Sequence, residues 1–121
     1  MTNLPITNKI YDLEERTLEF AKIIISLCDK IPKTISNTEL SKQLIRSGTS
    51  VGANYREATE ALGKKDFVHR MRIARKEAKE TNYWLALIQE SNNSLSNDIE
   101  LLSQESKELR NIFSSIINKA K

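Results

Sequence analysis

Hydrophobic residues recur at alternating steps of three and four along most of the chain, a spacing that places them on one face of an α-helix. In the first such segment, about residues 8–31, one face carries Leu13, Thr17, Phe20, Ile24, Leu27 and Ile31. Ile31 and Pro32 end this pattern, because proline lacks an amide hydrogen and disfavours helical backbone at the residue before it. The sequence therefore predicts a first helix at 8–31.

A second helix is predicted at about residues 37–62. Its apolar face is formed by Leu40, Leu44, Val51, Tyr55, Ala58 and Leu62. Ser36, with Glu39 three residues later, has the pattern of a capping box at the start of this helix. Gly63 stands at the C′ position, where a glycine often ends a helix.

Gly48 and Gly52 lie four residues apart inside the second segment. Each should cost the helix up to about 1 kcal/mol relative to alanine. We expect the helix to continue through both, with another helix packed unusually close; a break at residues 47–52 is the alternative. The segment lacks the preceding strand and the Gly-Lys-Ser/Thr ending of a phosphate-binding loop.

Two further helices follow, at about residues 64–91 and 95–119. The core face of the third carries Phe67, Met71, Ala74, Ala78 and Leu85. The fourth has heptad spacing at Leu95, Ile99, Leu102, Ser106, Leu109, Phe113 and Ile116. Because the connections are short, consecutive helices should be antiparallel, so the predicted fold is an all-α, up-down-up-down four-helix bundle. We expect residues 1–121 to form a single domain of this kind.

Composition favours the same fold class. The chain has only 3 Gly and 2 Pro in 121 residues, whereas β-sandwiches and doubly wound α/β folds need such residues at many turns. Cys28 is the single cysteine, so no intrachain disulfide forms, and we interpret it as a small buried side chain in a reducing compartment. The sequence shows no signal peptide and no apolar run of the roughly 20 residues that span a bilayer. We therefore expect a soluble, cytoplasmic protein without membrane attachment.

The net charge of +3 is concentrated in the middle of the chain. Residues 1–39 carry five basic and six acidic side chains, residues 40–79 ten and four, and residues 80–121 four and six. On the predicted third helix, an arc about 120° wide contains Lys64, Lys65, Arg72, Arg75, Lys76 and Lys79. We interpret this arc as a surface for nucleic-acid phosphates. Because Tyr83 at its end is the only aromatic residue beside it, we expect neither base stacking nor sequence readout. Ordinary solvation of a helix face is the alternative.

Five apolar residues lie beside the core faces of the first and third helices. They are Leu18, Ile25, Ile73, Trp84 and Ile88. A homo-oligomer interface would cover them; neighbouring helices of the same bundle are the alternative. Glu77 falls on the same apolar flank of the third helix, and a buried carboxylate needs a partner. We predict a structural ion pair, for which the candidate partners are Arg46, Arg56 and Arg70.

The sequence contains no constellation typical of catalysis. His69 is the single histidine, and it lacks the Glu-x-x-His pattern of di-metal bundles. We expect it at the surface, near the basic arc. Cys28 falls on a different predicted helix, so a Cys–His nucleophile is not expected. We therefore expect a protein that is not an enzyme and has no cofactor and no metal.

Three segments together resemble a known family: DLEERTLEFAK at 12–22, IRSGTSVGANYREA at 45–58 and KKDFVHRMRIARKEAKETNYWLALI at 64–88. They are similar to the bacterial four-helix-bundle proteins encoded in intervening sequences of 23S ribosomal RNA genes. More distantly, the chain resembles the accessory variability protein of diversity-generating retroelements. That protein is a positively charged pentameric barrel that works with a reverse transcriptase on nucleic acid.

The resemblance implies a small cytoplasmic bundle that assembles into a ring-like homo-oligomer, with a pentamer as the favoured form, and it implies no cofactor and no catalytic residue. Together with the basic arc, it indicates an oligomer that binds RNA or DNA non-specifically, because a ring repeats one weak patch. The alternative is a protein–protein scaffold or accessory subunit that docks a partner enzyme through the same surface, without binding nucleic acid.

Overall fold

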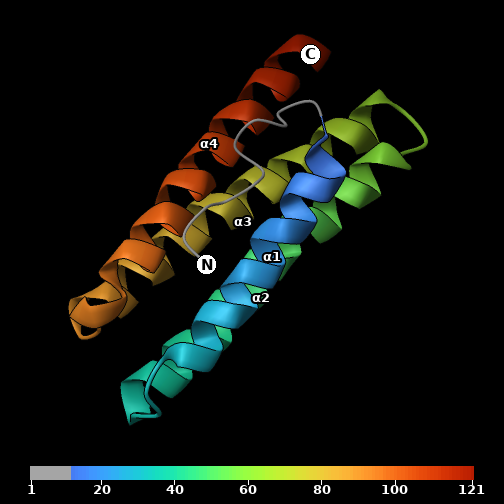
Figure 1. Ribbon diagram of the computed structural model, residues 1–121. Coiled ribbons are helices and arrows are strands. Elements are labelled where there is room, and N and C mark those ends of the chain that lie inside the picture. Colours follow the sequence, from blue (N-terminus) through green and yellow to red (C-terminus); the bar gives the residue numbers. More distant parts are fainter. Residues whose placement is uncertain (1–11) are drawn as a thin grey trace.

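Four long antiparallel α-helices make up the computed structural model, which describes residues 12–121 (Figure 1). They are α1 (Leu13–Lys30), α2 (Ile35–Thr59), α3 (Lys64–Glu90) and α4 (Ser96–Ala120), with one turn of 3-10 helix, η2 (Asn93–Leu95), before α4. No residue in the described part of the chain belongs to a strand. The predicted all-α, up-down-up-down fold is confirmed.

Each helix packs chiefly on the next one in sequence, and of the four pairs of adjacent helices in the bundle, α1 and α4 touch least. Large side chains from all four helices fill the core and have no exposed surface: Phe20, Ile24, Leu44, Met71, Leu85, Ile99, Leu102 and Phe113. Complete burial of such a side chain is worth about 1.5–3 kcal/mol relative to exposure. The periodic apolar positions therefore supply the main driving force for folding.

The two glycines of α2 allow α1 to pack close to it. The helix continues through both, as predicted. A Cβ atom added at Gly48 would lie 3.1 Å from Cδ1 of Ile24, and one added at Gly52 would lie 2.8 Å from Oγ1 of Thr17. A larger residue at Gly52 would therefore push α1 away from α2, and close packing offsets the low helix propensity of glycine.

The predicted start of α2 is wrong. The capping residue is Thr34, whose extended backbone precedes the first turn and whose Oγ1 accepts a hydrogen bond from the amide of Asn37 at 3.1 Å. Ser36 already lies inside the helix, so the predicted capping box with Glu39 does not form its start. The predicted start of the first helix at residue 8 lies outside the described residues, within which α1 begins at Leu13 and is capped by Asp12.

The predicted end of α2 is also wrong. The helix stops at Thr59 instead of Leu62, because Ala58 is its last buried residue and the side chains beyond it have no core to pack against. Leu62 is 99% exposed. Gly63 has an extended backbone, with φ 178°, and precedes the first turn of α3 as its N-cap. It therefore starts the third helix and does not close the second.

Buried polar contacts fix the register of the helices. At one end of the bundle, Asn37 and Asn92 exchange two side-chain hydrogen bonds of 3.1 and 3.0 Å, which tie the first turn of α2 to the α3–η2 connection. Farther along, the Thr81 hydroxyl donates to that of Ser47 at 2.9 Å between α3 and α2. These groups are satisfied inside the bundle, as buried polar groups generally are.

Candidate nucleic-acid interface

The outward face of α3 carries a row of basic side chains that we call the basic stripe. Its members follow steps of four and three residues and are all exposed: Lys65, His69, Arg72, Lys76 and Lys79. This spacing keeps them within about 40° of one direction over about 21 Å of helix. The single histidine therefore lies at the surface, among the cations.

The charges of the basic stripe are not neutralised by the rest of the bundle. Within residues 12–121, its lysines and its arginine take part in no ion pair. The two nearest carboxylates on α3 point elsewhere: Asp66 lies about 100° from Lys65 around the helix, and Glu80 pairs with Arg46 of α2. The stripe is thus a positive surface whose donors are available to an outside anion.

Two of the six residues predicted to bind nucleic acid lie on the flank of α3 that faces α4. Lys64 is exposed there, at the first position of the helix. Arg75 is half-buried, and its Nη1 donates to Oγ of Ser114 on α4 at 3.3 Å. The fold therefore uses Arg75 to join α3 to α4, whereas the other five predicted residues are free at the surface.

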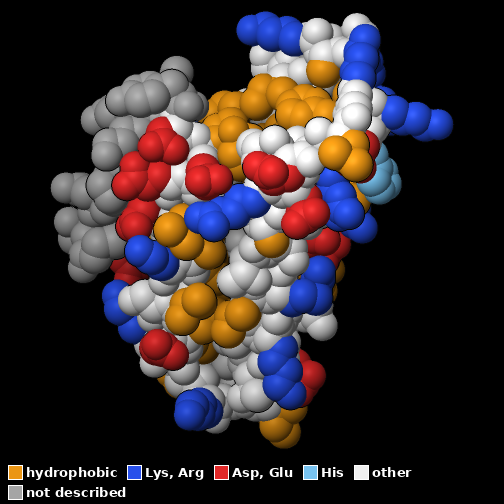
Figure 2. Space-filling view, turned by 90° about the vertical axis from the view of Figure 1, so that its right-hand side faces the viewer, with side chains coloured by type: hydrophobic (Ala, Val, Ile, Leu, Met, Phe, Trp, Pro, Cys, Tyr) orange, Lys and Arg blue, Asp and Glu red, His pale blue; other side chains and the backbone are white. Residues whose placement is uncertain are grey.

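Two shallow hollows adjoin the N-terminal end of the stripe. One, of about 510 Å³, is lined by Lys64, Lys65, Val68, His69 and Arg72. The other, of about 590 Å³, is lined by Leu62, Gly63, Lys64, Lys65, Asp66 and His69. Figure 2 shows the histidine, in pale blue, beside Lys and Arg side chains at this edge of the molecule. No side chain caps the first turn of α3, so its free amides add to the positive potential.

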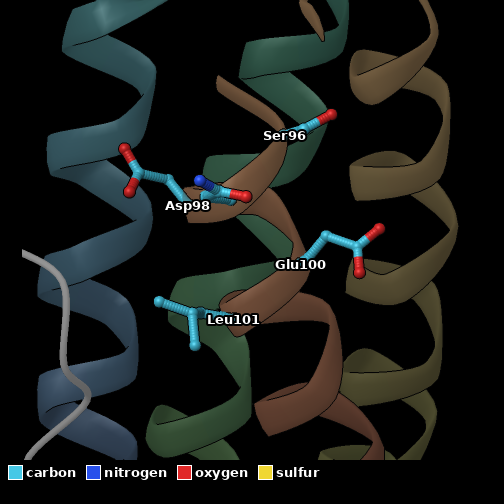
Figure 3. Close-up of a pocket in the computed structure, with 5 residues that line it drawn as sticks. Ser96, Asp98, Glu100 and Leu101 are labelled. Atoms are coloured by element: carbon cyan, nitrogen blue, oxygen red, sulfur yellow. The ribbon is translucent and has the colours of Figure 1, made fainter. Parts of the chain in front are cut away.

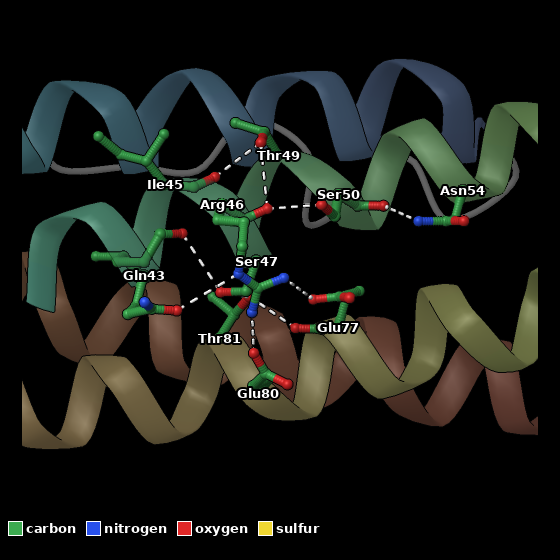
Figure 4. A network of polar contacts seen from close by, with 11 residues as sticks. Gln43, Ile45, Arg46, Ser47, Thr49, Ser50, Asn54, Glu77, Glu80 and Thr81 are labelled. Carbon is green, nitrogen blue, oxygen red and sulfur yellow. Dashed lines mark hydrogen bonds and ion pairs between the residues drawn. The ribbon is translucent and has the colours of Figure 1, made fainter.

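Glu77 is buried, 7% exposed, and pairs with an arginine of the neighbouring helix. Nη1 of Arg46 on α2 lies 3.3 Å from Oε1 of Glu77, and Nη2 of the same guanidinium bonds to Glu80 one turn away. Figure 4 shows Arg46 reaching from α2 to both carboxylates of α3. Of the three candidate arginines, the structure pairs Glu77 with Arg46 and brings neither Arg56 nor Arg70 to it. We call this set the outer cluster (Arg46, Glu77 and Glu80).

A second cluster, between α1 and α4, was not predicted. We call it the inner cluster (Arg16, Glu105 and Glu108). Nε and Nη2 of Arg16 donate to Glu105 at 2.7 and 2.9 Å, and Nη2 also donates to Glu108 at 2.9 Å. Both side chains of the Arg16–Glu105 pair are completely buried. Burial raises the pKa of the Glu105 carboxyl, against the lowering effect of its hydrogen bond to Arg16.

A sequence signal for the inner cluster did exist. Arg16 lies three residues after Leu13 and four before Phe20, and Glu105 has the same relation to Leu102 and Leu109. Both charged residues therefore sit at positions that the helical period assigns to the core. A charge at such a position requires an opposite charge across the interface.

The five residues predicted for an oligomer interface do not share one surface. Leu18 and Ile25 on α1 are 41% and 44% exposed, and Ile73 and Trp84 on α3 are half-buried. Ile88 has no exposed surface, so its prediction as an interface residue is wrong. Around the axis of α3, Ile88 lies about 40–60° closer to the direction of the core than Ile73 and Trp84 do. The other helices of the same subunit therefore cover it.

A third hollow, of about 540 Å³, lies at the start of α4 and is lined by Ser96, Asn97, Asp98, Glu100 and Leu101. Its two carboxylates point in opposite directions (Figure 3). Asp98 pairs with Nζ of Lys30 on α1 at 3.3 Å, and Glu100 accepts a hydrogen bond from Gln89 on α3 at 3.0 Å. Because each is held by a different helix, they do not form a general acid–base pair.

The remaining reactive side chains are also dispersed. Cys28 on α1 is half-buried, and burial raises the pKa of its thiol, which disfavours the nucleophilic thiolate. His69 lies on a different helix, α3. In the part of the chain that the structure describes, no group of three or more His, Cys, Asp or Glu side chains could hold a metal ion. No helix there is long and apolar enough to cross a membrane.

Comparison with known proteins gives two matches. Residues 9–115 match the model of a family described as 23S rRNA-intervening sequence protein. The crystal structure of a protein with unknown function from the S23 ribosomal protein family of Bacteroides thetaiotaomicron is similar, with a TM-score of 0.77 and 37% sequence identity. That match covers 86% of this chain and 96% of the other. Comparison with curated proteins gives no match.

Proposed function

The chain belongs to the family of 23S rRNA-intervening sequence proteins, and from this premise we propose that it is a non-enzymatic protein that binds nucleic acid non-specifically through α3. The observation that carries the proposal is the basic stripe. Its side chains are exposed in a row, and the lysines and the arginine have no ion-pair partner within residues 12–121.

A row of this kind fits a phosphate backbone. Each bound cation displaces condensed counterions from the nucleic acid, so the binding free energy is largely entropic and weakens as salt is added. Contacts with phosphates position a protein but carry no base information. The stripe contains no asparagine or glutamine that could pair with adenine and no acidic side chain that could accept from cytosine. We therefore expect its cations to contact chiefly phosphates, without sequence preference.

The proposal includes assembly into a ring of identical subunits. Five is the number that the more distant resemblance to the accessory variability protein favours. Leu18, Ile25 and Ile45 leave apolar surface exposed on α1 and α2. Ile73 and Trp84 leave further apolar surface on the side of α3 that faces α2, on either side of the outer cluster. Two different apolar areas on one subunit fit a head-to-tail contact, which closes into a ring when the rotation permits. A ring would repeat the basic stripe and raise the avidity.

Light scattering tests the assembly directly. We expect a mass of about five times the subunit mass of 13.8 kDa. A particle of 13.8 kDa at tens of micromolar protein would contradict the ring. Replacing Ile25 with glutamate should then dissociate the ring while leaving the helical circular dichroism unchanged, because this side chain is 44% exposed in the single subunit.

Fluorescence anisotropy with labelled RNA and DNA tests binding. We expect measurable affinity at low salt that is lost when Arg72, Lys76 and Lys79 are changed to glutamate. The matched control changes three exposed lysines outside the stripe to glutamate, with the same change in net charge: Lys33, Lys107 and Lys119. The control should retain most of the binding. Wild-type protein that binds no nucleic acid at low salt would overturn the proposal and favour the scaffold that docks a partner enzyme through this face.

A further inference from the structure

The face of α3 that carries the basic stripe continues beyond its last lysine. Two further steps of four residues lead from Lys79 to Tyr83 and Leu87, which lie within about 40° of the same direction. Tyr83 is 58% exposed and Leu87 is 38% exposed. One continuous face therefore changes from cationic to apolar along its length, and its apolar end presents an aromatic ring.

The Tyr83 ring is held in place from the side. It meets the indole of Trp84 edge-on, with ring centroids 5.0 Å apart and an angle of 68° between the planes. Trp84 is itself half-buried and packs against the core. An exposed ring that is already positioned loses little conformational freedom when a ligand covers it.

The sequence alone predicts no base stacking, but the exposure of Tyr83 and its contact with Trp84 change this interpretation. We propose that Tyr83 is a stacking platform for an unpaired base, so that the nucleic acid held by the basic stripe is preferentially single-stranded. This inference rests on the proposed function. In a duplex each base is covered by its neighbours, whereas an unpaired base offers an open aromatic face to a protein side chain. The phosphates adjoining that base would then follow Lys79 and Lys76 along the helix.

The chemistry of this face favours nucleic acid over an acidic protein partner. The ligand must supply a regularly repeated negative charge opposite the stripe and a flat apolar group opposite Tyr83. A single strand supplies both in each nucleotide, since every base has an aromatic face whatever its sequence. Between Lys65 and Leu87, no carboxylate lies within 40° of the centre of this face, so the whole length is open to a polyanion.

The test compares a labelled single strand with a blunt duplex of the same sequence, using the full chain. For Tyr83→Ala we expect roughly tenfold weaker binding of the single strand and binding of the duplex close to that of the wild type. Tyr83→Phe keeps the ring and should bind both as the wild type does. Ile35→Ala, which removes an apolar side chain that is 89% exposed at the start of α2, is the matched control and should change neither affinity.

A strand that contains the fluorescent base 2-aminopurine gives an independent signal, because stacking on an aromatic ring quenches it. We expect quenching with the wild type and Tyr83→Phe, and its loss with Tyr83→Ala. Equal affinities and equal quenching for wild type and Tyr83→Ala would overturn the stacking platform while leaving the stripe as a binding surface. Failure of the wild type to bind either oligonucleotide would overturn the proposed function, and this inference with it.

Discussion

Two arginines join neighbouring helices of this bundle by the same arrangement, at different depths. In each case one guanidinium bonds to two glutamates that lie three residues apart on another helix. Arg16 connects α1 to α4 and Arg46 connects α2 to α3. The carboxylates are Glu105 and Glu108 in the inner cluster and Glu77 and Glu80 in the outer cluster.

The difference lies in access to water. The Arg16 side chain has no exposed surface, whereas 47% of the Arg46 side chain is exposed. Charges attract more strongly where water is excluded, but a charge that loses its partner there cannot be solvated instead. The inner cluster also joins α1 and α4, the adjacent pair of helices that touch least. One arginine with two glutamates should therefore matter much more to stability in the inner cluster than in the outer cluster.

The largest expected effect follows from removing the inner arginine. Arg16→Ala leaves the completely buried Glu105 without its positive partner, and we expect a loss of about 3–5 kcal/mol in the free energy of unfolding. Urea denaturation followed by circular dichroism measures this loss. A change below about 1 kcal/mol, the range of an exposed ion pair, would show that water reaches the cluster.

Replacing both partners of the buried pair sharpens the comparison. In Arg16→Met combined with Glu105→Met, no buried charge is left uncompensated, because the side chain of Glu108 is 39% exposed and water can solvate it. We therefore expect most of the stability lost in Arg16→Ala to return. The same denaturation experiment applies. If the double variant is as unstable as Arg16→Ala, then the arginine acts by filling space between α1 and α4 and not by compensating a charge.

A smaller effect is expected in the outer cluster. Glu77→Ala removes a carboxylate that is 10% exposed at its side chain, but its partner Arg46 keeps Glu80 and remains in contact with water. We expect a loss of about 1–2 kcal/mol, below that of Arg16→Ala. Thermal unfolding of the two variants side by side measures the order, and a larger effect for Glu77→Ala would reverse the interpretation based on burial.

The smallest effect is a dependence on pH. Burial raises the pKa of Glu105 above the ordinary 4.5, so the folded protein holds this proton more tightly than the unfolded chain does. Protonation of Glu105 therefore favours folding, and this contribution is lost as the pH rises through the raised pKa. As the pH rises from about 4 to 7, we expect the Tm of the wild type to fall relative to the Tm of Glu105→Gln. A rise in the Tm of the wild type relative to Glu105→Gln over this range would contradict a raised pKa of Glu105.

Much of the fold could be predicted because it depends on short-range periodicity. Steps of three and four residues located all four helices, and the cost of Gly48 and Gly52 pointed to a close neighbour, which is α1. The start of α2 was harder to predict, since Thr34 and Ser36 are both suitable N-cap residues. The choice depends on where the backbone leaves the extended conformation after Pro32.

The basic stripe could be predicted for the same reason, since its residues belong to a single helix. What could not be predicted depends on partners far apart in the sequence. Arg75 turns toward Ser114 on α4, and Arg16 meets a carboxylate 89 residues away. Helical periodicity marks the positions of such residues but does not identify what faces them. The interface prediction for Ile88 was wrong because only about 40–60° of rotation around α3 separates the helix surface from the bundle core.

The basic stripe differs from both arginine clusters because its cations have no carboxylate partner among residues 12–121. The salt dependence of nucleic-acid binding tests most directly whether the stripe is the binding surface. For each phosphate neutralised in a single strand, the slope of log K against log salt should be about −0.7. We expect Lys76→Ala to reduce the steepness by roughly one such contact, and the exposed off-stripe control Lys107→Ala to leave it unchanged. The same slope for Lys76→Ala and the wild type would contradict binding through this face.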